Sequence, residues 1–138
     1  MLRISVLFTL LIVAQSSFAQ TADEYYKSAK EKMADGNHSD AIEDLNQALS
    51  KDKENTNYLL ARGEAKVEAG KGILAIQDFN RVIQLDAENS MAYTSRSAIY
   101  VSMKDYKGAI EDCKKAIEID PKNELAYVKM GDSFFFQD

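Results

Sequence analysis

The side chains best suited to catalysis are few in this 138-residue sequence and stand far apart. The chain has a single histidine, His38, and a single cysteine, Cys113. A catalytic cysteine needs a base within hydrogen-bond reach, but His38 falls in a predicted turn and Cys113 on a later apolar stripe. We therefore expect Cys113 to be a small buried hydrophobe, His38 to be a solvated turn residue, and the protein not to be an enzyme.

The sequence also lacks motifs for binding a metal ion or a phosphate group. No spacing of residues matches a metal site or a glycine-rich phosphate loop, so we expect no metal and no cofactor. Two acidic pairs, Glu43-Asp44 and Glu111-Asp112, are expected to begin helices, where carboxylates stabilise the positive end of the helix dipole. Asn37-His38-Ser39 fits the N-glycosylation sequon, a three-residue match that chance produces often.

Residues 1–19 have the organisation of a secretory signal peptide. Arg3 gives a basic start, residues 4–14 are largely apolar, and Ser17 and Ala19 place small residues three and one positions before a cleavage point. A membrane span needs roughly 20 apolar residues, so we favour cleavage after Ala19 over an anchor. We expect an exported protein, periplasmic or secreted, with no membrane span after cleavage.

The charge balance argues against nucleic acid as a partner. The sequence has 17 Lys and Arg against 22 Asp and Glu, a formal net charge of −5. Binding to nucleic acid or to an anionic membrane needs clustered basic residues, which do not occur here. With one cysteine, an exported chain has no internal disulfide and depends on packing alone.

A repeat of 34 residues organises the chain after the signal peptide, because segments beginning at Ala22, Thr56, Ser90 and Glu124 align without a gap. Small residues recur at the eighth and twentieth places: Ala29, Gly63, Ser97 and Gly131, then Ala41, Ala75 and Ala109. Such small side chains let two helices approach closely. Each segment is therefore expected to contain a closely packed pair of helices.

Apolar residues within a segment have helical spacing. One stripe of the third segment consists of Ala109, Ile110, Cys113, Ala116 and Ile117. Turn residues separate the two halves of each segment: Asp35-Gly36-Asn37, Gly70-Lys71-Gly72 and Lys104-Asp105. Two helices of about 14 residues cannot bury both of their stripes alone, so the hairpins must stack. We predict an all-α fold of stacked helical hairpins.

This pattern resembles the tetratricopeptide repeat over residues 22–55, 56–89 and 90–123, with residues 124–138 matching a partial fourth repeat or capping helix. The matching residues are Tyr25, Ala29, Gly36, Ala41, Leu45 and Ala48; Leu59, Gly63, Ala75, Phe79 and Asp86; and Tyr93, Ser97, Tyr100, Tyr106, Ala109, Ala116 and Pro121. His38, Lys53, Gly72 and Ala87 depart from the pattern; Gly72 replaces the usual aromatic residue at the turn. The resemblance implies a right-handed α-solenoid of three repeats and the first helix of a fourth.

The resemblance also implies that the first helices line a concave face that holds an extended or helical segment of a partner protein. Its inward places are the second, fifth, ninth and twelfth of each repeat. They carry Asp23, Tyr26, Lys30 and Met33; Asn57, Leu60, Glu64 and Val67; Met91, Thr94, Ala98 and Val101; and Leu125, Val128, Asp132 and Phe135. The twelfth-place residues Met33, Val67 and Val101 are equally well explained by contact with neighbouring helices.

The chemistry of this face favours an apolar ligand. Some repeats of the family hold a terminal carboxylate with Lys and Asn at the fifth and ninth places. Here those places carry Leu60 and Glu64, then Thr94 and Ala98, which cannot form that clamp. A mostly apolar groove suits a hydrophobic peptide or helix. The first function hypothesis is therefore an exported adaptor, scaffold or assembly factor that binds a protein partner.

Three aromatic residues, Phe134, Phe135 and Phe136, lie two residues from the end of the sequence. They fall on a first helix that has no second helix after it in the alignment. At least one ring is expected to be exposed, which marks an interface. The alternative function is therefore a structural one: the N-terminal part of a longer solenoid, or a unit that self-associates end to end through this helix.

Overall fold

The computed structural model describes residues 20–137, which form seven helices and no strand. The helices are α2 (Ala22–Ala34), α3 (His38–Lys51), α4 (Thr56–Glu68), α5 (Gly72–Leu85), α6 (Ser90–Ser102), α7 (Tyr106–Ile119) and α8 (Glu124–Gln137). The predicted signal peptide, residues 1–19, lies outside the described residues. Within the described part, none of the helices has both the length and the apolar character that crossing a bilayer requires.

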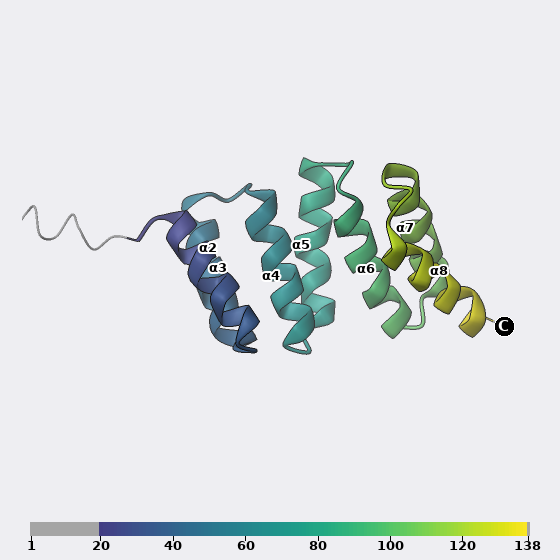
Figure 1. Ribbon diagram of the computed structural model, residues 1–138, viewed down its shortest axis with the longest axis horizontal. Coiled ribbons are helices and arrows are strands. Elements are labelled where there is room, and N and C mark those ends of the chain that lie inside the picture. The colour runs from purple at the N-terminus through teal and green to yellow at the C-terminus, as the bar shows by residue number, and fades with distance from the viewer. Residues whose placement is uncertain (1–19, 138) are drawn as a thin grey trace, which may run out of the picture.

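The helices form a row of stacked hairpins that runs from α2 to α8 (Figure 1). α2 packs on α3, α4 on α5 and α6 on α7, and α8 covers the last hairpin. The first helices also touch one another, α2 with α4, α4 with α6 and α6 with α8, whereas α3, α5 and α7 do not. The predicted solenoid of helical hairpins is confirmed, and α2, α4, α6 and α8 form its inner layer.

The last place of each repeat starts the next inner helix. Asn55, Asn89 and Asn123 stand at the thirty-fourth place, and the side-chain oxygen of each accepts a hydrogen bond from a backbone N–H in the first turn of α4, α6 or α8. Thr21 does the same for α2 through a capping box with Glu24. A side-chain cap of this kind stabilises a helix by about 1 kcal/mol. The repeat period therefore sets the boundaries of the inner helices.

The turn inside each hairpin needs a left-handed residue at the fifteenth place. Gly36, Gly70 and Lys104 occupy it with φ of 78°, 74° and 62°. The following N–H bonds back to the carbonyl five residues earlier, from Asn37, Lys71 and Asp105, at 2.7–2.9 Å. This arrangement ends the first helix. Only Lys104 carries a side chain in a conformation that costs about 1 kcal/mol for an L-residue.

The eighth place of the inner helix packs on the twenty-fourth place of the outer helix. In the second hairpin, a Cβ added to Gly63 would lie 2.6 Å from the Phe79 ring, and Phe79 is fully buried. The corresponding pairs are Ala29 with Leu45, and Ser97 with Cys113. A larger outer side chain thus accompanies a smaller inner one, as close packing demands.

The twenty-third residue of each repeat is an aspartate that forms an ion pair with the inner helix of its hairpin. Asp78 receives a two-point hydrogen bond from Arg62 at 2.6 and 3.1 Å, and Asp112 receives one from Arg96 at 2.6 and 2.7 Å. Asp44 binds Lys32 at 2.6 Å. Asp44 and Asp112 lie in the second turn of α3 and α7, so their predicted role at the helix dipole was wrong. They hold the inner helix of their hairpin instead.

The same arginines connect successive hairpins. Arg62 also donates to Asn46 at 2.9 Å, and Arg96 to Asn80 at 2.6 Å. Each bond reaches the outer helix of the preceding hairpin, α3 or α5. One guanidinium therefore joins three helices, because its fork offers donors in several directions.

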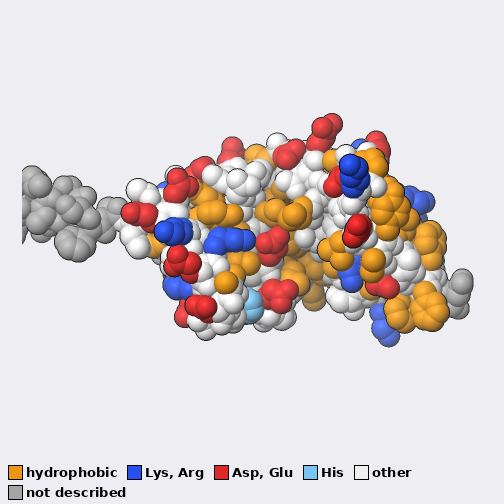
Figure 2. Space-filling view, in the orientation of Figure 1, with side chains coloured by type: hydrophobic (Ala, Val, Ile, Leu, Met, Phe, Trp, Pro, Cys, Tyr) orange, Lys and Arg blue, Asp and Glu red, His pale blue; other side chains and the backbone are white. Residues whose placement is uncertain are grey.

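The aromatic residues of α8 are exposed. Phe134, Phe135 and Phe136 have 50, 78 and 57% of their surfaces accessible, which confirms the prediction of an exposed ring. The eighth-place Gly131 has no neighbouring atom within 4 Å of the position of a Cβ, unlike Gly63. Figure 2 shows the resulting cluster of hydrophobic side chains at the α8 end. The side of α8 that would face a second helix is therefore open.

The packing of Gly63 on Phe79 gives the first prediction. Gly63→Ala should lower the free energy of unfolding by about 1–3 kcal/mol, because the new methyl group collides with a buried ring. Adding Phe79→Leu, which copies the Ala29 and Leu45 pair of the first hairpin, should recover much of that loss. Urea unfolding of the two single variants and the double variant measures the coupling. If the loss of stability in the double variant equals the sum of the losses in the two single variants, the proposed size complementarity of Gly63 and Phe79 is wrong.

Candidate functional site

The residues suited to catalysis are well separated in the structure. Cys113 is fully buried in α7, as predicted, and burial raises the pKa of its thiol. His38 is the first residue of α3 and is half-buried, so its description as a solvated turn residue was wrong. Its Nδ1 atom is buried without a hydrogen-bond partner. Among the described residues, no group of His, Cys, Asp and Glu is arranged to hold a metal ion.

The inner layer offers a different kind of site, a groove between α4, α6 and α8. Its central cavity has a volume of about 150 Å³ and adjoins a second of about 400 Å³. The two share Thr94, Ser95 and Leu125. We call the two cavities together the central groove. Its lining residues are Glu64, Val67, Glu68, Phe79, Ser90, Met91, Thr94, Ser95, Ala98, Asp120, Asn123 and Leu125.

Six of the sixteen predicted inward residues meet in the central groove. The structure brings together Glu64, Val67, Met91, Thr94, Ala98 and Leu125. The others lie elsewhere on the inner layer: Asp23, Tyr26, Lys30, Met33, Asn57, Leu60, Val101, Val128, Asp132 and Phe135. Sequence reasoning missed Glu68, four residues after Glu64 on the same face, and Asn123, whose capping role had no counterpart in the repeat pattern used.

The hydroxyl group of Thr94 is hydrogen-bonded within the protein and is not free to bind a ligand in the groove. Only 2% of its surface is exposed. Its Oγ1 donates to the Ser90 carbonyl at 3.0 Å and accepts from the Asn123 amide at 2.8 Å. The same amide also donates to the Ser90 hydroxyl at 2.7 Å. Asn123 thereby ties the start of α8 to α6 and closes the floor of the groove.

The floor is apolar and the charged rim is acidic. Val67, Ala98 and Leu125 supply apolar surface, and Glu64, Glu68 and Asp120 supply carboxylates. Within the part of the chain that the structure describes, neither cavity is lined by Lys or Arg. An apolar ligand with basic groups would match this surface.

Glu64 is the most buried carboxylate of the groove. It is half-buried, and desolvation raises the pKa of its carboxyl group, an effect that the charge of Lys30 partly offsets. Glu68 and Asp120 are exposed. A charge removed from water without a partner is unfavourable, so Glu64 is the point where a cation would gain most.

The α2 end of the inner layer is an aromatic cluster. Tyr26 stacks on Tyr58 with ring centroids 5.0 Å apart. The Tyr58 hydroxyl donates to the Asp23 carboxylate. This bond, followed by burial, raises the pKa of Tyr58 to about 12. Two predicted groove residues, Asp23 and Tyr26, thus fix α2 against α4.

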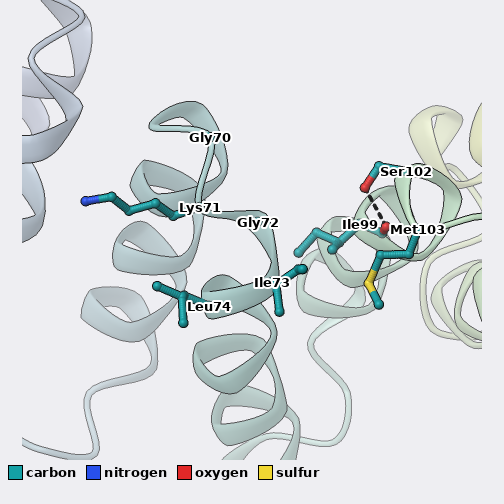
Figure 3. Close-up of a pocket in the computed structure, with 8 residues that line it drawn as sticks. All are labelled: Gly70, Lys71, Gly72, Ile73, Leu74, Ile99, Ser102 and Met103. Carbon is teal, nitrogen blue, oxygen red and sulfur yellow. Dashed lines mark hydrogen bonds between the residues drawn. The ribbon is translucent and has the colours of Figure 1, made fainter.

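A further cavity of about 330 Å³ lies at the edge of the stack, between the α4–α5 turn and the end of α6. Figure 3 shows Ile99 of α6 and Met103, which directly follows α6, opposite Gly72 and Ile73 of α5, with Lys71 pointing away. The third hairpin has Tyr106 at the place of Gly72, so the missing side chain leaves this space open. The replacement of the usual aromatic residue by Gly72 was the feature of the sequence that indicated this cavity.

Family models recognise the repeats. Two models described as tetratricopeptide repeat match residues 26–90 and 91–123. No curated protein sequence matches the chain.

Solved structures share the fold. The first tetratricopeptide domain of Spaghetti (RPAP3), bound to the HSP90 peptide SRMEEVD, superposes with a TM-score of 0.82 at 20% identity, over 86% of this chain and 94% of that one. The Sgt2 domain from Aspergillus fumigatus has a TM-score of 0.79 at 26% identity, over 84 and 78%. MamA has a TM-score of 0.82 at 26% identity, over 90 and 72%.

The bond between Tyr58 and Asp23 can be tested by titration. A folded-state pKa above the usual 10 means that Tyr58 contributes stability that is complete below about pH 10. That contribution is lost as the pH rises through about 12. Asp23→Asn should move the Tyr58 pKa back toward 10, measured by NMR of the tyrosine rings. Glu31→Gln, which alters an exposed acid on the same helix, should leave it in place; equal shifts in both variants would contradict the assignment.

Proposed function

Residues 26–123 are tetratricopeptide repeats, and on this premise we propose that the protein is a binding module that holds a peptide or helix of a partner protein on its inner layer. The central groove is the observation that carries this proposal. It combines apolar surface with a few polar groups, the usual composition of a ligand site. The RPAP3 domain, whose fold is the same, is bound to a peptide of HSP90.

The role that we propose is non-enzymatic, as an adaptor, scaffold or assembly factor. Support comes from the positions of His38 and Cys113, on α3 and α7, in separate hairpins. A nucleophile and its base must lie within about 3 Å of each other. The groove itself holds carboxylates and hydroxyl groups but neither of these two residues.

We further propose that the protein is exported and that residues 1–19 are removed after Ala19. The support is the order of a basic start, an apolar run and small residues before the cleavage point. Mass spectrometry of the protein recovered from its expressing cell should show a chain that begins at Gln20. Recovery of a chain that retains residues 1–19 would contradict this proposal.

A second candidate function is self-association through α8. The observation that favours it is the exposed apolar surface of Phe134, Phe135 and Phe136 next to the uncovered Gly131. Such a patch exceeds what scattered surface residues present. Light scattering over a range of concentrations should show a dimer that Phe135→Asp abolishes. A monomer at every concentration would contradict this second function.

Substitution in the groove tests the binding function. Leu125 is 54% exposed, so Leu125→Asp should leave the fold intact and place a charge on the apolar floor. We expect it to weaken binding of peptides selected from a random displayed library by at least about tenfold, since burying an unpaired charge is costly. Ile73→Asp is the matched control, because Ile73 is 68% exposed and lies outside the groove.

Binding that survives Leu125→Asp but is lost in Ile73→Asp would place the ligand at the edge of the stack and contradict the groove assignment. Circular dichroism and thermal melting of both variants establish that any loss of binding is local.

A further inference from the structure

Glu64 differs from the other buried carboxylates in having no partner. Asp44, Asp78, Asp112 and the half-buried Asp132 are each bound by a basic side chain. Among residues 20–137, Glu64 takes part in no hydrogen bond or ion pair, although it is half-buried and desolvation raises its pKa.

The nearby basic residues do not form an ion pair with Glu64. Lys30 occupies the same ninth place in the preceding repeat and acts on Glu64 only through the field of its charge. Its own side chain is exposed to solvent. Lys66, two residues after Glu64, is bound to Asp78 at 2.7 Å on the other side of α4. The cations of α4 are thus committed to the hairpin interior.

The surroundings of Glu64 are suited to a long basic side chain. Val67, Ala98 and Leu125 line the cavity beside it. A Lys or Arg side chain can lay its aliphatic stem along such surface while its charged head meets a carboxylate. Glu68 and Asp120 add negative charge at the rim. An acidic ligand would meet three carboxylates and no lining cation.

We propose that the central groove selects an apolar peptide segment that carries a Lys or Arg, and that Glu64 is the specificity-determining residue because it pairs with that basic group. This inference rests on the proposed binding function and names the chemistry of its ligand. It predicts a preference opposite to that of the RPAP3 domains, whose bound peptides, SRMEEVD and SGPTIEEVD, are rich in acidic residues.

The experiment selects random 12-residue displayed peptides on the immobilised full chain, and in parallel on Glu64→Gln, Glu64→Lys and Glu31→Gln. Peptides enriched on the unaltered chain should contain Lys or Arg among apolar residues. Glu64→Gln should abolish the basic excess and Glu64→Lys should replace it with Asp or Glu. Glu31→Gln is the matched control: it removes a similar charge from α2 of the same inner layer, at an exposed position outside the central groove, and should retain the basic excess.

A synthesised peptide from that selection then gives the size of the effect. Glu64→Gln should weaken its binding about tenfold, as expected for a partly desolvated charge-assisted hydrogen bond. The same substitution should change by less than about twofold the binding of a peptide whose Lys is replaced by Met. Gln is close in size to Glu and removes a desolvated charge, so the variant should melt no lower than the unaltered chain.

The outcomes separate this inference from the proposed function. Enriched peptides without a basic excess, or an excess that Glu64→Gln leaves unchanged, would overturn the role of Glu64 while the groove still binds. Loss of the excess in Glu31→Gln to the same degree would show that only overall charge matters and would also overturn it. Absence of any enriched peptide would overturn the binding function itself.

Discussion

The fold depends on how closely the two helices of each hairpin approach at the eighth place. Gly63 lies so near the Phe79 ring that the structure has no room for a Cβ there. The first and third hairpins pack other pairs at the same two places, Ala29 with Leu45 and Ser97 with Cys113. All four residues are fully buried. Because protein interiors are close-packed, the size of one residue restricts the other. Close helices then bring the seventh-place arginines within reach of the aspartates on the outer helices.

Those ion pairs determine which surface is left for binding. Arg62 and Arg96 each hold an aspartate of their own hairpin and an asparagine of the preceding one. Because both guanidinium groups are paired between the hairpins, they do not reach the groove on the inner layer. The described residues that line this groove are acidic or uncharged. A buried ion pair adds little net stability by itself. Its two-point geometry nevertheless fixes how one hairpin sits on the next, and thereby the shape of the groove.

Part of the site could be predicted from the repeat, because the resemblance to the family gave the places that face inward. Four residues at those places, Glu64, Val67, Ala98 and Leu125, line one cavity between three helices. The repeat pattern did not reveal that the Thr94 hydroxyl is bound by Asn123, because that partner lies 29 positions away in the sequence. It also failed for Asp112, read as a helix-start residue, because α7 begins six residues earlier at Tyr106.

By itself the sequence determined the helical hairpins and their stacking, since small residues and turn residues recur every 34 positions and each acts locally. Only the tertiary structure decided which inward residues share a cavity, and that Glu64 lacks a partner while Asp78 has two. The physical reason is that burial and pairing are set by distances between hairpins. Side-chain size and reach control those distances, and no periodic pattern encodes them.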